Sequence, residues 1–401
     1  MNILIVVKNI KEGGVVRAAV NYKKCFESIR CNVKFYIIEN ANKEYIRFYN
    51  IKKKDLYNNN LKEKWIVDIG FIISHGITLK DFISLDNIFI TRWFEINIFS
   101  VPSVYENRLV ESFQLSKWMR FLYLLRGGIH EGKILPHPVN FNDFFYQKNN
   151  LIRKKYKIPK NSKILLRVGQ ESIGKWSPLI IKAFKIINLS DPNFFLVLLG
   201  APKELIKLIY DLDSNIKNKI IILKFNKDYK YLRNLYSEAD LFWHIADQGE
   251  SFGYVLAESL LCKTPVVTLQ TPWADNTQAE IIGESRGGVV CHTISDFVNQ
   301  SINLINNKKR YSQSLFYGEK FIRNNYSINS ISLFLKKNII NFKNSTTKIH
   351  VPLKEIVKIL DFGSFSFRSK LIILYCKIVM IIFRQKSFIF FRLIKKLNYL
   401  I

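Results

Sequence analysis

The sequence predicts an α/β protein with two domains, each built on a parallel sheet, followed by a basic and apolar C-terminal tail. Two observations carry this prediction. At 401 residues the chain exceeds the roughly 250 residues at which a single core usually stops growing. Short runs that are apolar throughout alternate with helical patterns along two separate stretches, as expected for strands that are covered on both faces.

The first series of elements opens the chain and defines a domain that we place at residues 1–145. We expect strands in MNILIVV, VKFYII, WIVDIGFIIS and NIFITRWF, and a helix in VVRAAVNYKKCFESI. KILPHPV then interrupts the pattern with Pro136 and Pro138. The opening run is short and has neither a basic start nor a small-residue cleavage site, so it predicts a strand rather than a secretion signal.

The second series predicts a domain at residues 146–345. We expect strands in KILLRVG, FFLVLLG, IIILKF, DLFWHIA and TPVVTLQ, and helices in IIKAFKIIN, YLRNLYSEA and YVLAESLLC. In a parallel sheet of this kind, ligands bind at the carboxyl ends of the strands, where loops meet helix N-termini. The site residues are therefore expected just after strands.

The tail, residues 346–401, interleaves apolar and aromatic residues with cations. From residue 350 on, ten basic residues stand against Glu355 and Asp361. Lys377 interrupts the longest apolar run, which is too short to span the ~30 Å of a bilayer core. Apolar faces combined with cations suit the surface of an anionic membrane, which is the partner we expect for residues 350–401. The alternative is a helix pair packed on the protein body or on another subunit.

Charge and cysteine content limit the partners and the compartment. Lysine and arginine total 61 against 32 acidic residues, a net charge of +29 that attracts phosphate-bearing partners, although compositional drift towards lysine explains it equally well. No dense basic tract is present in the sequence, so nucleic acid is not an expected partner. The five cysteines form no C-x-x-C pair and predict free thiols. We expect a cytoplasmic protein, peripheral on the inner membrane face where the tail binds lipid.

The segment GESFGYVLAE, residues 249–258, is the strongest candidate site. Ser251, Phe252 and Gly253 lie between a predicted strand and a predicted helix that starts at Tyr254. The N–H groups of a first helical turn have no intrahelical partner and attract anions, and glycine lets a ligand approach the backbone closely. A phosphate group is the expected ligand.

Two carboxylates flank this predicted phosphate site. With Glu250 before the helix and Glu258 inside it, a rise of 1.5 Å per residue places their Cα atoms on the order of 10 Å apart. Such a separation suits an elongated ligand, with sugar hydroxyls at Glu250, phosphate at the amides and ribose hydroxyls at Glu258. A nucleotide sugar has this shape. For the two acids taken alone, chance or a solvated helix face is the alternative.

The same segment resembles the E-x7-E region of the retaining GT-B glycosyltransferases of the family 4 type, the glycosyl transferases group 1. The matching positions are Glu250, Phe252, Gly253, Glu258, Pro265, Val266 and Val267. The resemblance covers roughly residues 1–340 and implies two Rossmann-like domains facing across a cleft. It implies a retaining transferase of the hexosyltransferase type that moves a sugar from a nucleotide-sugar donor to a glycan or lipid-linked acceptor, in cell-surface polysaccharide synthesis.

A second segment, RVGQESIGK, resembles the family's glycine and lysine turn, with Gly169 and Lys175 at the matching positions. The resemblance implies that Lys175 supplies a point charge for the donor diphosphate, both when bound and as the leaving group. Gln170 stands where the family commonly has arginine, so one phosphate contact is expected to be absent. Arg167 replaces that contact only if its side chain turns into the cleft.

Four further positions follow from the resemblance. Gly13 and Gly14, in KEGGVVRAAV, match the Gly-Gly turn at which the first domain meets the donor phosphate. His75 follows a predicted strand where the family often places a histidine near the transferred sugar; a structural histidine is the alternative. Phe225 lies in the region that holds the base, and a buried core phenylalanine is its alternative.

The resemblance implies neither a metal nor a cofactor, because Lys175 and helix amides neutralise the diphosphate. Within the same fold, a sugar-nucleotide epimerase or a phosphorylase stays open as an alternative. A glycoside hydrolase requires carboxyl groups ~5–10 Å apart across one bond and has no use for Lys175. A basic adaptor for membrane or nucleic acid, the alternative from another class, explains the charge and the tail but not the site motifs.

Overall fold

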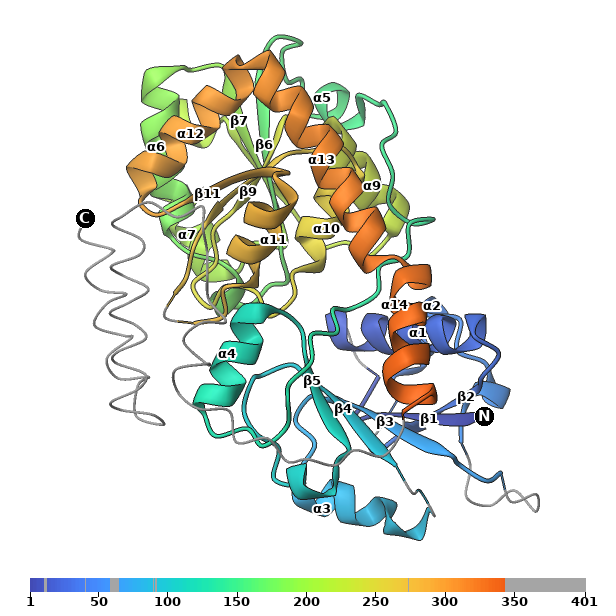
Figure 1. The fold of residues 1–401 in the computed structure, drawn as a ribbon. Helices are drawn as coiled ribbons and strands as arrows, with labels where there is room; N and C mark the ends of the chain where they lie inside the picture. Colours follow the sequence, from blue (N-terminus) through green and yellow to red (C-terminus); the bar gives the residue numbers. More distant parts are fainter. Residues whose placement is uncertain are drawn as a thin grey trace. The chain divides into compact units, whose positions relative to one another are not determined.

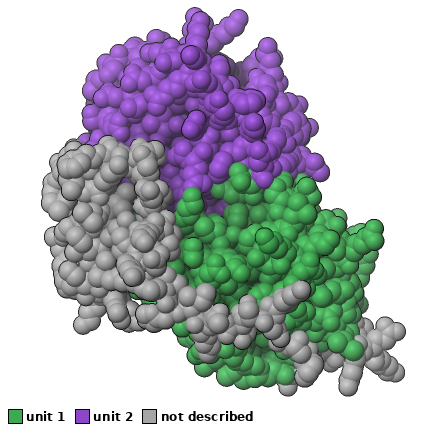
Figure 2. Space-filling model, in the orientation of Figure 1, with its two compact units in different colours: residues 1–140, 325–361 green, residues 141–324, 362–401 purple. Residues whose placement is uncertain are grey.

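The computed structural model describes residues 1–10, 13–39, 41–57, 65–88, 90, 92–272 and 274–342. The predicted tail, residues 346–401, and its membrane contact lie outside these residues. Two compact units are present, coloured separately in Figure 2: of the described residues, unit 1 holds 1–140 and 325–342, and unit 2 holds 141–324. Each unit contains a parallel sheet with helices, which confirms the predicted fold class (Figure 1).

The sheet of unit 1 has five strands in the order β2-β1-β3-β4-β5, all parallel. The strands are β1 (Asn2–Val7), β2 (Asn32–Ile37), β3 (Ile69–Ser74), β4 (Trp93–Asn97) and β5 (Glu111–Gln114). Every residue of β3 is buried, as expected for a central strand covered on both faces. The strands expected in MNILIVV, VKFYII and WIVDIGFIIS are present as β1, β2 and β3. The strand expected in NIFITRWF begins only at Trp93 and continues to Asn97, and β5 was not expected.

The helices of unit 1 include one that comes from the far end of the described chain. They are α1 (Gly14–Ser28), α2 (Lys43–Phe48), α3 (Leu79–Ile83), α4 (Lys117–Leu125) and α14 (Ile328–Leu335). α14 packs on α1, where the Ser28 and Ser332 hydroxyls lie 2.7 Å apart, and Val139 N donates to Tyr326 O at 2.7 Å. The sequence led us to expect residues 146–345 in one domain. In the structure, the apolar side of α14 packs on α1, so this helix belongs to unit 1.

The sheet of unit 2 has six parallel strands in the order β11-β10-β9-β6-β7-β8. The strands are β6 (Lys163–Val168), β7 (Phe194–Leu199), β8 (Ile220–Leu223), β9 (Leu241–His244), β10 (Val266–Leu269) and β11 (Gly288–Cys291). The chain order runs outward from β6 to β8 and then returns through β9 to β11. β6 and β9 are therefore neighbours at the point where the order reverses, the place where such sheets bind ligands.

The helices of unit 2 connect these strands (Figure 1). They are α5 (Leu151–Lys155), α6 (Leu179–Ser190), α7 (Lys203–Tyr210), α8 (Ser214–Lys217), α9 (Tyr229–Glu238), α10 (Tyr254–Leu261), α11 (Thr277–Ser285) and α12 (Ile294–Asn306). The long α13 (Lys308–Tyr326) then leads out of the unit. The bounds of α10 confirm the helix predicted at residues 254–261. Among the described residues, none of the helices combines the length and the apolar character needed to cross a bilayer.

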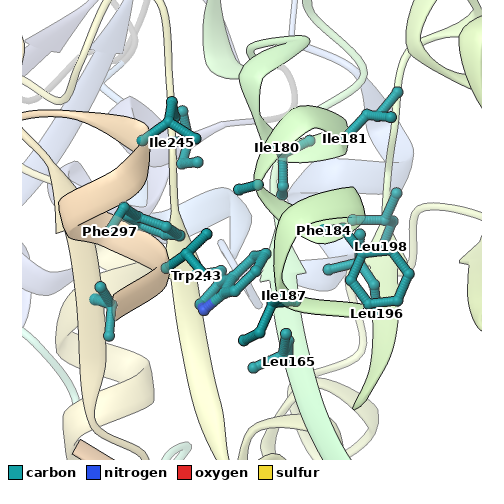
Figure 3. Packing of buried hydrophobic residues seen from close by; sticks show 14 of the residues in the cluster. Leu165, Ile180, Ile181, Phe184, Ile187, Leu196, Leu198, Trp243, Ile245 and Phe297 are labelled. Carbon is teal, nitrogen blue, oxygen red and sulfur yellow. The ribbon is translucent and has the colours of Figure 1, made fainter. Parts of the chain in front are cut away.

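Trp243 is at the centre of the core on one face of this sheet (Figure 3). Its ring centroid lies 5.0 Å from that of Phe297, and its Nε1 donates to the Ser301 hydroxyl at 3.0 Å. Side chains alternate along a strand, so the next residue, His244, faces the opposite side of the sheet together with Thr268 of β10. That face carries the candidate site.

Candidate functional site

Three loops meet at the carboxyl edge of the unit 2 sheet, because the strands that precede them, β10, β9 and β6, are neighbours. The loop after β9 contacts the loop after β6 through the backbone, where Gln248 N donates to Gly174 O at 3.0 Å. It contacts the region after β10 where Thr277 N donates to Glu250 O at 3.1 Å. The segment GESFGYVLAE thus lies between two other loops, as the position of site residues after strands predicts.

Arg167, near the end of β6, holds the loop that carries Lys175. Its guanidinium is completely buried, donates from Nη2 to Lys175 O at 2.6 Å, and lies over the Trp176 ring, 5.3 Å from the centroid. Burial lowers the pKa of Arg167 to about 10, so the group stays charged at neutral pH. The Arg167 side chain therefore points into the protein interior and holds the Lys175 loop through its hydrogen bond to the Lys175 carbonyl.

Lys175 and Glu250, both predicted site residues, form an ion pair. Lys175 Nζ donates to Glu250 Oε2 at 2.7 Å, and His244 Nε2 lies 3.3 Å from Glu250 Oε1. Glu250 is 7% exposed and His244 is completely buried, whereas the Lys175 side chain keeps 32% of its surface exposed. A carboxylate held on both oxygens at the floor of the site is well placed to accept hydrogen bonds from a polar ligand.

Electrostatics keep this carboxylate ionised. Burial disfavours the charged form of Glu250, but Lys175, the His244 hydrogen bond and Arg167 outweigh it and hold the pKa below its usual range. For His244, burial and the charge of Arg167 lower the pKa to about 4, against the opposing effect of Glu250. At neutral pH the site therefore contains a charged Glu250 and an uncharged His244.

Backbone contacts fix the main chain around Glu250. Its N–H donates to Gln278 Oε1 at 3.0 Å, and Gln278 Nε2 in turn donates to the Thr271 hydroxyl at 2.6 Å. Gly249, just before it, has φ +64° and approaches Asp275 so closely that an added Cβ would lie 1.8 Å from Asp275 O. Only glycine fits at this position.

Gly249→Ala is therefore expected to unfold more easily and to lose donor binding. The positive φ alone costs about 1 kcal/mol or more, and the clash with a backbone oxygen adds to it. Gly127→Ala is the matched control, because Gly127 has φ +90° but no atom within 4 Å of the added Cβ. Thermal unfolding monitored by circular dichroism measures both variants. Equal losses in Tm would show that the close approach at Gly249 is unimportant.

The segment that is predicted to bind phosphate lies at the start of α10. Gly253 is the N-cap residue, with φ +80°, a left-handed conformation that favours glycine. Ser251 is half-buried, and the Phe252 ring packs edge-on against Tyr254, with centroids 4.9 Å apart. α10 begins four residues after Glu250, whose carboxylate pairs with Lys175, so the helix N-terminus follows closely in the chain on the residue that holds this cation.

Glu258 lies on α10 in the interior of unit 2. It is 3% exposed, and Tyr236 of α9 donates its hydroxyl to Glu258 Oε2 at 2.8 Å. Burial and the charge of Glu258 raise the pKa of Tyr236 well above its usual value, so the phenol keeps its proton and remains the donor. The ribose contact expected for Glu258 stays a prediction.

The other predicted residues of unit 2 follow β6 and β8, and Gly200 follows β7 between them. Gly169 N donates to Leu199 O at 3.1 Å, and Gln170 O accepts from Trp176 Nε1 at 2.8 Å. An added Cβ at Gly200, φ +75°, would lie 2.1 Å from Gly169 O and 3.1 Å from the Phe225 ring. Phe225 is half-buried, so it lies at the sheet edge rather than in the core.

In unit 1, the predicted residues also follow strands. Gly13 precedes α1 with φ +138°, and Gly14 is its first residue. His75 follows β3, is exposed, and its ring lies 5.3 Å from that of Phe99. Although the side chain reaches solvent, the protein atoms around its ring and the positive charge of Lys8 lower the pKa of His75. The uncharged imidazole is thus the favoured form at neutral pH.

The sequence did not single out His244, Thr268 or Gln278, although all three touch Glu250 or its neighbours. The available signal for His244 was a polar residue at the end of an otherwise apolar strand, beside the predicted site. In the described part of the chain, no three His, Cys, Asp or Glu side chains gather closely enough to hold a metal ion.

Comparison with known proteins gives a family match and a fold. Residues 148–320 match the family of glycosyl transferases group 1, which confirms the resemblance for this part of the chain. No curated protein gives a significant match to the chain. The segment that matches the family contains Lys175, Glu250, Glu258 and the start of α10.

Solved structures with two Rossmann-like domains of the GT-B type are similar to the chain. Anabaena Alr3699/HepE in complex with UDP has a TM-score of 0.67 at 14% identity, covering 85% of this chain and 100% of that one. A glycosyltransferase from Rickettsia africae ESF-5 has 0.66 at 18%, covering 85% and 99%. WaaG, a glycosyltransferase involved in lipopolysaccharide biosynthesis, has 0.57 at 13%, covering 85% and 100%. At these identities the likeness establishes the fold.

Proposed function

We propose that this chain, which carries the glycosyl transferases group 1 match at residues 148–320, transfers a sugar from a nucleotide-sugar donor to an acceptor hydroxyl. The observation that supports it best is the Lys175–Glu250 pair, 2.7 Å long, in which Glu250 lies four residues before the first residue of α10. This arrangement combines a cation and backbone N–H groups for a diphosphate with a carboxylate for a sugar.

In this proposal each part of the donor has its own protein partner in unit 2. The diphosphate binds Lys175 and the amides of Phe252 to Tyr254, with the Gly169 turn close by. Sugar hydroxyls donate to Glu250, which electrostatics keep ionised. Ribose hydroxyls bind the carboxylate of Glu258, and the base lies against Phe225, which is half-buried at the sheet edge.

We propose a retaining reaction on the donor's own face. The acceptor oxygen forms a bond to the anomeric carbon as the bond from that carbon to the diphosphate oxygen breaks. The acceptor proton passes to the departing diphosphate, whose negative charge Lys175 and the helix amides stabilise. Glu250 holds the sugar and stabilises positive charge at the anomeric carbon. His75 and the Gly13–Gly14 turn, both in unit 1, are proposed to contact the sugar and phosphate.

A glycan or lipid-linked acceptor in surface polysaccharide synthesis is the acceptor class we propose. Two facts support it: WaaG, one of the similar structures, acts in lipopolysaccharide biosynthesis, and the sequence from residue 350 on carries ten cations among apolar residues. Such a segment suits the inner face of an anionic membrane, where lipid-linked acceptors are located. HepE, which is described with UDP-glucose, makes UDP-sugars the first donors to test.

A thermal-shift screen of UDP-, GDP-, ADP- and dTDP-sugars tests the donor. At 100 times Kd, a ligand stabilises the folded state by about 2.7 kcal/mol, which raises Tm by roughly 5–10 °C for a domain of this size. The donor that shifts Tm is then incubated with candidate acceptors. A new glycosidic bond supports transfer, whereas an altered or phosphorolysed sugar indicates an epimerase or phosphorylase. No shift with any nucleotide sugar would contradict the proposed function.

A further inference from the structure

Glu250 is anchored by two donors of different character. Lys175, on a loop and partly exposed, bonds Oε2 at 2.7 Å; His244, on β9 and completely buried, lies 3.3 Å from Oε1. A lysine side chain has four rotatable bonds and loses them only at a cost in entropy, whereas an imidazole on a central strand is rigid. Of the two anchors, His244 is the one whose position the fold determines.

The chemistry of its neighbours determines which nitrogen of His244 carries the proton. An ionised carboxylate can only accept, so Nε2 must carry a hydrogen and donate to Glu250. In an uncharged ring the other nitrogen, Nδ1, then has no hydrogen and accepts. Thr268 Oγ1 lies 3.0 Å from Nδ1 and is its donor, since the other acceptor within reach of this hydroxyl, Leu269 O, is farther away at 3.5 Å. A chain of hydrogen bonds runs from Thr268 through His244 to Glu250.

The charges around the ring keep it uncharged. Arg167 of β6 and Lys175 of the following loop oppose its protonation, and Glu250 favours it, while Thr268 of β10 is neutral. Burial adds to the effect of the two cations, which leaves the pKa of His244 at about 4. The tautomer deduced from the geometry is thus the state of the ring at neutral pH.

We propose that His244 is a positioning residue that holds Glu250 towards the donor sugar, and that Thr268 selects the tautomer in which His244 can do so. The proposal rests on the proposed function. His244 holds Oε1 of Glu250 independently of Lys175. Lys175 can therefore turn to the diphosphate while Glu250 keeps its orientation. The lone pairs of the carboxylate that neither donor uses remain directed at the sugar hydroxyls.

Steady-state kinetics with His244→Ala and His244→Gln test the proposal. In His244→Ala, kcat for transfer is expected to fall on the order of 10²-fold, because a poorly oriented carboxylate costs that much. Affinity for the nucleoside diphosphate, measured by calorimetry, is expected to stay unchanged, because Lys175 and α10 remain. In His244→Gln the side-chain amide can donate from the place of Nε2, so part of kcat is expected to return.

Ser301→Ala is the matched control. It removes the buried hydrogen bond of Trp243, the residue next to His244, on the opposite face of β9. A purely structural role for His244 predicts that Ser301→Ala and His244→Ala lower Tm and kcat together. The positioning role predicts that Ser301→Ala lowers Tm and leaves kcat unchanged.

A spectroscopic measurement adds a readout that needs no turnover. Nitrogen NMR of histidine-labelled protein is expected to show His244 protonated at Nε2 and bare at Nδ1, and Thr268→Val is expected to produce a mixture of tautomers. Normal kcat in His244→Ala, or a proton on Nδ1 in the wild-type protein, would overturn the proposal. A wild-type protein that transfers no sugar would instead overturn the proposed function, so the two failures are distinguishable.

Discussion

Replacing Glu250 by glutamine is expected to abolish sugar transfer, with kcat lower by at least about 10²- to 10³-fold and only a modest loss of donor affinity. The carboxylate is proposed to stabilise positive charge that develops at the anomeric carbon, an interaction stronger in the transition state than in the ground state. Its loss therefore affects kcat more than KM. Stopped assays of product formation, together with calorimetry for the donor, measure the two effects separately.

The geometry around Glu250 gives this substitution a second effect. Both oxygens face donors, Lys175 Nζ at 2.7 Å and His244 Nε2 at 3.3 Å. A glutamine amide has one oxygen and one nitrogen, so its N–H₂ group must face one of these donors, or His244 must change tautomer. The variant is thus expected to disturb the site locally, and an increased mobility of the Lys175 loop is the structural sign.

Acid pH is expected to reduce the stability difference between the wild-type protein and Glu250→Gln. The folded-state pKa of Glu250 is lower than the unfolded one. The ionised carboxylate therefore stabilises the fold above the unfolded value of about 4.3, and this stabilisation is lost as pH falls further.

Glu238→Gln is the control, since Glu238 caps α5 through the N–H groups of Ile152 and Arg153. It should lose stability but keep kcat; normal turnover in Glu250→Gln would refute the proposed role.

The fold was largely predictable because the buried strands of parallel sheets are apolar along their whole length. FFLVLLG illustrates this, since it contains β7, and YVLAESLLC shows the helical pattern that became α10, with Gly253 as its N-cap. The return of residues 325–342 to unit 1 was not predictable. It depends on contacts between residues about 300 positions apart, such as Ser28 and Ser332, and no change in composition marks the boundary.

Residues of the candidate site were predictable where a charged side chain follows a strand, and were not predictable where a side chain lies inside a buried strand. Lys175 and Glu250 follow strands, and charged groups there suggest a ligand; the structure places them in contact. His244 lies inside a strand, where a polar residue is usually a satisfied member of the core. Its partners, Thr268 on β10 and Glu250 in a loop, are joined only when strand order and register are known.

Replacing Lys175 by methionine is expected to remove most of the preference for nucleoside diphosphate over monophosphate and to lower kcat by about 10²-fold. The Lys175 side chain is partly exposed, so solvent screens its charge and its hydrogen bond to a phosphate lies at the low end for charge-assisted bonds. We expect it to contribute about 1.5 kcal/mol, which is roughly tenfold in affinity. Loss of the Lys175 charge also raises the pKa of Glu250, so the acid limit of activity should move to higher pH.

Lys163→Met is the control. Lys163 lies at the other end of β6, pairs with Asp240, and loses the same charge in this variant. Equal diphosphate preference in both variants would show that Lys175 does not bind the donor phosphates.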